Sequence, residues 1–129
     1  MAELQVAVVS AERSVWKGAA KSVVAKTPDG EIGIMPGHEP VLALLVESPL
    51  RIEEPDGRKL VVAVHGGFFS VDSNTVNVIA EVAEFAEDID VERAKSALAR
   101  AQERGEDDQA ALRRAQARIT AAGMGGSPR

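Results

Sequence analysis

The sequence lacks cysteine and tyrosine and has only one tryptophan and three phenylalanines among its 129 residues. Without cysteine, a disulfide framework, a zinc–thiolate site and a cysteine nucleophile are all excluded. The scarcity of aromatic side chains argues against a surface on which nucleic-acid bases stack. The net charge of −5 argues against binding to a phosphate backbone. We therefore expect no nucleic-acid partner.

Long hydrophobic runs are also missing. No apolar stretch approaches the ~20 residues that a membrane-spanning helix needs. The N-terminus carries Glu3 and lacks the positive start and apolar core of a signal peptide. We therefore expect no direct membrane insertion, a cytosol-like compartment, and contact with a membrane only through a partner.

Catalytic motifs are absent as well. The sequence has no Gly-x-Ser-x-Gly elbow, no phosphate-binding Gly-x-x-x-x-Gly-Lys-Ser/Thr loop and no His-x-x-His metal spacing. Its two histidines are His38 and His65. A lone histidine in a loop or at a strand end is most often a structural or interface residue. The sequence therefore predicts no catalytic residue and no metal ligand.

From Leu4 to about Phe85 the sequence is rich in short runs of β-branched residues. The runs are Leu4–Val9, Ser22–Ala25, Val41–Val46, Leu60–Val64 and Val76–Ile79, and they are separated by turn signals such as Asp29-Gly30, Pro55-Asp56-Gly57 and Gly66-Gly67. Many short strands at roughly even spacing predict an antiparallel sandwich or flattened barrel. The segment Pro55-Asp56-Gly57 predicts a hairpin turn.

The segment Gly30–Pro40 combines three Gly, two Pro and His38 with only three large apolar residues. Because glycine permits positive φ and proline fixes φ, we expect this segment to be a loop of defined shape. Such a loop between two apolar runs is a candidate contact surface. The alternative is a long hairpin turn with no partner.

After Phe85 the composition becomes that of helices. Residues 90–122 contain no proline and are rich in Ala, Arg, Glu and Gln. We expect helices at about Val91 to Arg104 and Asp108 to Ala121, folded as an antiparallel hairpin. The predicted domains are 1–86 (β) and 87–122 (helical), with a flexible tail at 123–129.

The ends of both helices carry capping signals. Asp88 or Asp90 suits the start of the first helix and Gly105 suits its end, while Asp108 suits the start of the second.

The inward stripes of the two helices are made mostly of alanine. They are Ala94, Ala97, Leu98 and Ala101 on the first helix, and Ala111, Leu112, Ala115 and Ile119 on the second. A buried Leu contributes roughly 1.5–3 kcal/mol and Ala much less, so the hairpin closes tightly but is held weakly. We therefore hypothesise that it is mobile and can leave the β domain. The alternative is a fixed hairpin.

Arginine is concentrated in the helical half. Arg93 and Arg100 share one helix face, and Arg114 and Arg118 share another. Facing arginine pairs suit a polyphosphate, because guanidinium groups match phosphate oxygens. The alternative is pairing with neighbouring acids such as Glu92 and Glu103 on a solvated surface.

Three blocks of this sequence together resemble the epsilon subunit family of F-type ATP synthases. They are the Gly30–Pro40 loop (Gly-Glu-Ile-Gly-Ile-Met-Pro-Gly-His-Glu-Pro), the segment from Gly66-Gly67-Phe68-Phe69 to Ala80-Glu81, and Ala83–Asp90 (Ala-Glu-Phe-Ala-Glu-Asp-Ile-Asp). The likeness extends over nearly the whole chain and is weakest in residues 105–129. It implies a ten-stranded β-sandwich followed by a two-helix hairpin.

The resemblance also implies a function in the central rotating stalk. The sandwich would bind the gamma subunit and rest on the ring of c subunits, through a surface that includes Met35, Pro36, Gly37, His38, Glu39 and Pro40. The hairpin would reach the alpha/beta catalytic head when extended and inhibit ATP hydrolysis. The protein would not be catalytic itself and would lie peripherally on the cytoplasmic face of the bacterial cell membrane.

A possible regulatory ligand, ATP, is implied as well, although no cofactor is required. Some members bind ATP through an Ile/Leu-Asp-x-x-Arg-Ala motif, which residues 89–94 fit (Ile-Asp-Val-Glu-Arg-Ala). The implied ATP-binding residues are Glu84, Ile89, Asp90, Arg93, Ala94, Arg100, Arg114 and Arg118. A different interpretation is a stand-alone β-sandwich that binds a small ligand and carries a regulatory helical tail.

Overall fold

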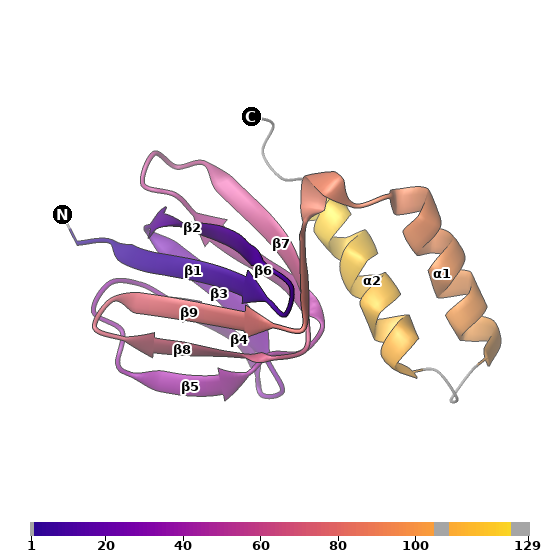
Figure 1. Cartoon of the computed structure of the whole chain (residues 1–129), viewed down its shortest axis with the longest axis horizontal. Coiled ribbons are helices and arrows are strands. Elements are labelled where there is room, and N and C mark those ends of the chain that lie inside the picture. Colours follow the sequence, from indigo (N-terminus) through magenta and orange to yellow (C-terminus); the bar gives the residue numbers. More distant parts are fainter. Residues whose placement is uncertain (1, 105–108, 125–129) are drawn as a thin grey trace.

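The computed structural model describes residues 2–104 and 109–124, which form a β-sandwich followed by two helices (Figure 1). The strands are β1 (Leu4–Ser10), β2 (Ser14–Ala20), β3 (Ser22–Thr27), β4 (Gly30–Ile34), β5 (Val41–Leu44), β6 (Ser48–Glu53), β7 (Lys59–His65), β8 (Phe68–Asp72), β9 (Thr75–Ala80) and β10 (Val82–Phe85). This confirms the predicted sandwich and its ten strands.

The strands form two five-stranded sheets, in the orders β2-β1-β9-β8-β5 and β10-β7-β6-β3-β4. All neighbours are antiparallel except β1 and β9, which pair in parallel from Gln5↔Thr75 to Ser10↔Ala80. The predicted antiparallel sandwich is therefore confirmed except at this one parallel pair. Between β1 and β9 the chain forms strands of the second sheet. The direction in which β1 and β9 pair therefore depends on the topology and not on the local sequence.

Alternation of side chains builds the core between the sheets. Leu4, Val6 and Val8 point inward from β1 and are almost fully buried, while the intervening residues of the strand face outward. Val76, Val78 and Ala80 do the same on β9. The main core cluster contains sandwich residues only, so the helices contribute no buried side chain to it among the described residues.

Two of the predicted turns have the expected backbone. Gly57 has a φ of +88° in the β6–β7 hairpin, where the backbone NH of Arg58 donates to Asp56 Oδ1 over 2.9 Å. Gly67, between β7 and β8, has a φ of +101°, and a Cβ there would lie 2.0 Å from the Ile79 carbonyl oxygen. That approach leaves room only for glycine.

The sequence suggested that the whole segment Gly30–Pro40 is a loop, but only part of it is. Gly30–Ile34 is the edge strand β4, which pairs with β3, and only Met35–Pro40 is a loop. Strand β2 was also missed. Both strands contain few β-branched residues, and their pairing with a stronger neighbouring strand overrides their low propensity.

The helices are α1 (Val91–Arg104) and α2 (Gln109–Met124), preceded by a 3₁₀ turn, η1 (Ala86–Asp88). Asp90 caps α1, because its Oδ1 accepts the backbone NH of Arg93 over 3.0 Å. The first helix has the predicted bounds. The second continues past Ala121 to Met124, so part of the predicted tail is helical. The predicted caps at Gly105 and Asp108 and the rest of the tail, 125–129, lie outside the described residues.

Helix α2 lies against the outer face of the second sheet, between the sandwich and α1 (Figure 1). Ala121 of α2 packs on Val61 and Ala63 of β7 and on Ala86 of η1. Strand β7 is therefore buried on both faces from Leu60 to His65. The contact forms a second apolar cluster, separate from the sandwich core.

Helix α1 packs mainly on α2 and not on the sandwich. The predicted alanine stripes lie in this contact: Ala94, Ala101 and Ala115 are buried, and Ala97, Leu98, Ala111, Leu112 and Ile119 are half-buried. What the sequence did not predict is the second alanine face of α2, formed by Ala117 and Ala121. The mobility of the hairpin stays a hypothesis.

Replacing Ala121 by Leu should loosen α2 from the sandwich. Ala121 is fully buried against β7, and forcing a larger side chain into a packed contact costs roughly 1–3 kcal/mol. Amide hydrogen exchange should become faster in α2 and stay unchanged in β1 and β9. The control is Ala110→Leu at an exposed position of the same helix. Equal exchange in both variants would contradict the packing described here.

Candidate functional site

A cavity of about 470 Å³ lies where the hairpin meets the sandwich. Its lining consists of Glu84, Asp88, Ile89, Asp90, Arg93, Ala94, Ala97, Arg100 and Arg118. Seven of the eight residues that the sequence assigned to ATP binding are among them, and Arg114 is the exception. Residues from β10, the η1–α1 connection and both helices therefore come together around one space.

The geometry of α1 places its part of the lining on one face. The helix repeats every 3.6 residues, so Arg93, Ala97 and Arg100 project to the same side. Asp90 fixes the start of this face by capping the helix. The small side chains of Ala94 and Ala97 leave the space between the two arginines open.

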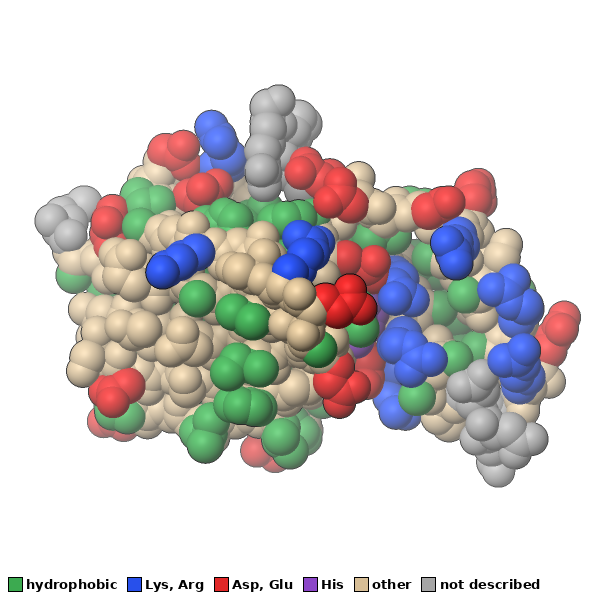
Figure 2. Space-filling model, in the orientation of Figure 1, with side chains coloured by type: hydrophobic (Ala, Val, Ile, Leu, Met, Phe, Trp, Pro, Cys, Tyr) green, Lys and Arg blue, Asp and Glu red, His purple; other side chains and the backbone are tan. Residues whose placement is uncertain are grey.

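The charges of the lining are balanced and segregated by element. Three arginines, on α1 and α2, face three carboxylates, all of which precede α1 in the chain. Figure 2 shows basic side chains gathered on the helical part beside acidic ones at its junction with the sandwich. Arg93 and Arg100 are exposed and form no ion pair with residues 2–104 or 109–124. Their N–H groups are therefore available to an anionic ligand.

Glu84 is the carboxylate with the most contacts in the site. Its Oε1 lies 3.2 Å from His65 Nε2 and also accepts the Nε–H of Arg118. The hydrogen bond from His65 lowers the pKa of Glu84, burial opposes this effect, and Arg118 lowers the pKa further. Glu84 therefore remains ionised and connects β10 to α2.

A second ion pair joins α2 to the sandwich. Arg113 Nε donates to Glu47 Oε1 over 2.9 Å, and Glu47 lies between β5 and β6. Neither residue lines the cavity described above. The helix is thus tied to the sandwich at two places, of which only the Glu84–Arg118 pair belongs to the site.

Arg114 lies outside the cavity because it precedes Arg118 by one helical turn, which is about 6 Å along the axis. The structure adds Asp88 and Ala97 to the lining. The proximity of Asp88 to the motif at residues 89–94 was a signal that could have indicated it. Glu92 and Glu103 form no ion pair with an arginine among residues 2–104 and 109–124, whereas Arg113 and Arg118 pair with the sandwich carboxylates Glu47 and Glu84.

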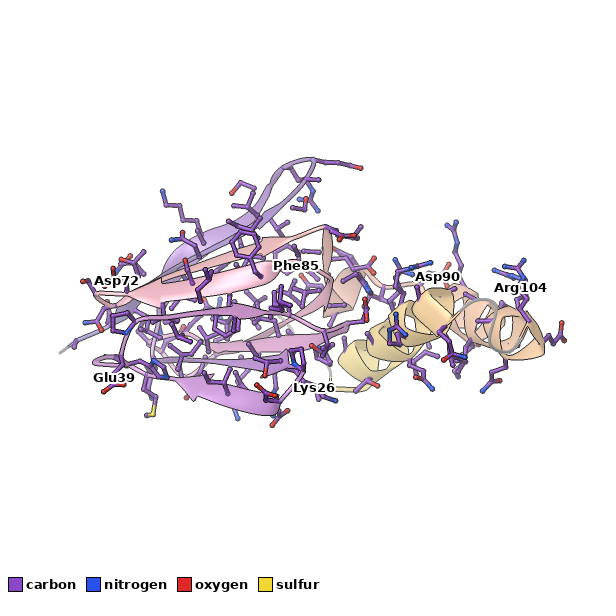
Figure 3. All side chains as sticks on the ribbon, turned by 90° about the horizontal axis from the view of Figure 1, so that it is seen from below. Lys26, Glu39, Asp72, Phe85, Asp90 and Arg104 are labelled. Carbon is purple, nitrogen blue, oxygen red and sulfur yellow. The ribbon has the colours of Figure 1, made fainter. Side chains whose placement is uncertain are left out.

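The predicted interface loop, Met35–Pro40, lies at the end of the sandwich away from the helices. Figure 3 shows Glu39 and Asp72 at that end, and Asp90 and Arg104 at the other. The Gly37 backbone NH donates to Asn74 Oδ1 over 2.7 Å, so the β8–β9 turn holds the loop. Met35 is 63% exposed.

An exposed apolar row crosses the outer face of the first sheet. Val9, Ile79, Phe68 and Leu44 are register partners on β1, β9, β8 and β5. Leu44 is 65% exposed, and Leu42 beside it on β5 is 71% exposed. Apolar side chains gather over β5 and β8 in Figure 2. This row is a candidate contact surface, because contiguous exposed apolar patches are typical of interaction sites. No local pattern in the sequence indicates this row, because each residue occupies an ordinary outward position of its strand.

Comparison with known proteins identifies the family. The family model described as ATP synthase, Delta/Epsilon chain, beta-sandwich domain matches residues 3–86. The ATP synthase epsilon chain of Rhodococcus jostii is 53% identical over 94% of this chain and 97% of its own length. That of Streptomyces coelicolor is 50% identical, covering 94% and 96%. The chain belongs to the ATP synthase epsilon chain family.

Two solved structures share the architecture of this chain. A chain of the Euglena gracilis mitochondrial ATP synthase, solved with OSCP, F1 and the c-ring, matches with a TM-score of 0.78 at 22% identity. The match covers 96% of this chain and 82% of that one. A chain from the central stalk and c-ring of the Tetrahymena thermophila enzyme matches with a TM-score of 0.56 at 18% identity, over 67% and 69%. At these identities the likeness concerns the fold.

Neither a membrane-spanning helix nor a metal cluster is found among the described residues. Within 2–104 and 109–124, neither helix is long and apolar enough to cross a membrane. The same residues contain no group of three or more His, Asp or Glu side chains that could hold a metal ion.

The Glu84 carboxylate should make the docking of α2 dependent on pH. Its pKa in the folded protein lies below the usual value of 4.5, so the ionised form stabilises the folded state. That contribution is full above the usual value and is lost as the pH falls through the lowered one. Unfolding by urea, followed by helical circular dichroism, should show a smaller loss of stability between about pH 6 and pH 3 in Glu84→Gln than in the parent.

The control for this measurement is Glu92→Gln, which removes an exposed carboxylate of α1. Its pH profile should follow that of the parent. A Glu84→Gln profile that also follows the parent would show that Glu84 contributes nothing to the docking.

Proposed function

We propose that this chain is the epsilon subunit of the central stalk of an F-type ATP synthase, where it couples proton-driven rotation to ATP synthesis without being catalytic. The observation that carries the proposal is the identity of about half of all residues with epsilon chains over nearly the full length. In this function the protein is peripheral on the cytoplasmic face of the bacterial cell membrane and reaches it through its partners.

The sandwich supplies two surfaces for these partners. The apolar row of Val9, Ile79, Phe68 and Leu44 suits the gamma subunit, because a torque-transmitting contact needs a large apolar area. The Met35–Pro40 loop, at the far end from the helices, suits the ring of c subunits. Both surfaces leave the hairpin side of the sandwich free.

The hairpin acts as an arm with two positions. In the compact position, seen here, α2 rests on β7 through alanine and two ion pairs, with no part in the sandwich core. In the extended position it reaches the alpha/beta catalytic head and inhibits ATP hydrolysis. The compact contact is small, so modest differences in free energy shift the arm.

ATP is the regulatory ligand that fits the cavity. The arginines at positions 93, 100 and 118 face a space bounded by α1 and α2, and guanidinium groups bind phosphate oxygens strongly. The cavity exists only while α2 lies against the sandwich and α1 packs on α2, because Glu84 belongs to β10 and the arginines belong to the helices. A bound nucleotide therefore stabilises the compact arm. No cofactor is required for this function.

Replacing Arg93 or Arg100 by Ala should weaken ATP binding without unfolding the sandwich. Each variant removes charge-assisted contacts worth roughly 1.5–3 kcal/mol, which corresponds to about a tenfold to hundredfold loss of affinity. Calorimetry with and without Mg²⁺ measures the affinity. The control is Lys95→Ala, an exposed cation of α1 outside the cavity. Absence of binding by the parent at millimolar ATP would remove the nucleotide function and leave the stalk function.

The variant Leu44→Asp should abolish binding to the gamma subunit. A carboxylate placed within an apolar contact loses its hydration without gaining a partner. A pull-down with purified gamma subunit measures binding, and addition to an epsilon-free enzyme measures inhibition of ATP hydrolysis. The control is Val82→Asp, also at an exposed apolar residue but outside the row. A parent protein that does not retain gamma would favour the stand-alone ligand-binding interpretation.

A further inference from the structure

His65 is a buried titratable residue that the proposed function does not use. It ends β7 beneath α2 and is 3% exposed. Its Nε2 lies 3.2 Å from Glu84 Oε1. Its Nδ1 is buried without a hydrogen-bond partner among the described residues, and it is the only buried side-chain nitrogen or oxygen of that part in this condition.

The contact with Glu84 assigns the donor role to Nε2 of His65. An ionised carboxylate only accepts hydrogen bonds, so Nε2 must be the donor, while the buried Nδ1 has no partner among the described residues. An unsatisfied buried polar atom is destabilising, and an apolar side chain would avoid it. What His65 contributes is therefore the Nε2–H that it gives to Glu84.

The hydrogen bond from His65 to Glu84 also affects the position of Arg118. The same Oε1 that accepts from His65 also accepts the Nε–H of Arg118. A guanidinium has five N–H groups in a rigid fork, and pairing through Nε leaves the four on its terminal nitrogens for another partner. Arg118 can thus bind Glu84 and a phosphate group at the same time, and both Glu84 and Arg118 line the cavity.

We propose that His65 is a positioning residue of the nucleotide cavity: it holds the Glu84 carboxylate so that Arg118 is tied to the sandwich by one edge and presents the other edge to the phosphates. This inference rests on the proposed ATP function. It links ligand binding directly to the docking of α2, because one guanidinium takes part in both contacts.

The pair Arg113–Glu47 provides the matched control. It also joins Nε of an α2 arginine to Oε1 of a sandwich glutamate, over 2.9 Å, but neither residue lines the cavity. Loosening α2 through Glu47→Gln therefore leaves the site's own contacts in place. A change at His65 disturbs the helix and the cavity together.

The experiment compares His65→Gln with His65→Asn. Both side chains are neutral amides, but only the longer glutamine places an N–H near the position of Nε2. We expect His65→Asn to lower ATP affinity roughly tenfold in calorimetry, the equivalent of one charge-assisted hydrogen bond. It should also speed amide exchange in α2. We expect His65→Gln to resemble the parent in both measurements, and Glu47→Gln to speed exchange while retaining ATP affinity.

The proposal is overturned if the Gln and Asn variants behave alike, or if His65→Asn loosens α2 without affecting ATP. If His65→Asn fails to fold, Arg118→Lys replaces it, since the ammonium of lysine lacks the planar fork that presents one edge to Glu84 and the other to a phosphate. Unchanged ATP affinity in that variant overturns the proposal. A parent that binds no ATP overturns the nucleotide function and the cavity role with it. Exchange in α2 then still decides whether His65 holds the helix through Glu84.

Discussion

The compact form of this protein depends on the packing of an alanine face of α2 against the outer face of one sheet. Ala121 meets Val61 and Ala63 of β7, and this cluster is separate from the much larger core between the sheets. Because alanine buries little apolar surface, the contact is close but weak. Burial of both faces of β7 therefore requires the helix, whereas the stability of the sandwich rests mainly on its own core.

Because the apolar contact between α2 and the sandwich is small, ion pairs at its edges are important for holding the helix in place. Two glutamates of the sandwich pair with two arginines of α2, and the two pairs differ in what else they do. Glu47 and Arg113 only hold the helix. Glu84 and Arg118 also line the cavity, and His65 donates a hydrogen bond to the Glu84 carboxylate. The docking of α2 and the lining of the cavity thus share one guanidinium, and the proposed coupling between a ligand and the position of the hairpin rests on this shared contact.

Much of the fold was readable from local sequence, and the failures have a common cause. The helix at Val91–Arg104 and the hairpin at Gly57 were predicted because period, caps and turn residues act within a few residues of each other. Strands β2 and β4 were missed because glycine, alanine and lysine have low strand propensity and are held by neighbouring strands. The parallel pairing of β1 with β9 joins segments some 70 residues apart, which no local pattern encodes.

Helical spacing in the sequence was enough to place Arg93 and Arg100 on one face of α1. The likeness of the sequence to a family also indicated most of the cavity lining. The packing of distant segments was needed to show that Arg118 enters the cavity while Arg114 does not, that His65 lies beside Glu84, and that four apolar residues align into one row across four strands. These facts depend on how α2 docks and how strands pair, and both are set by packing between segments distant in the chain.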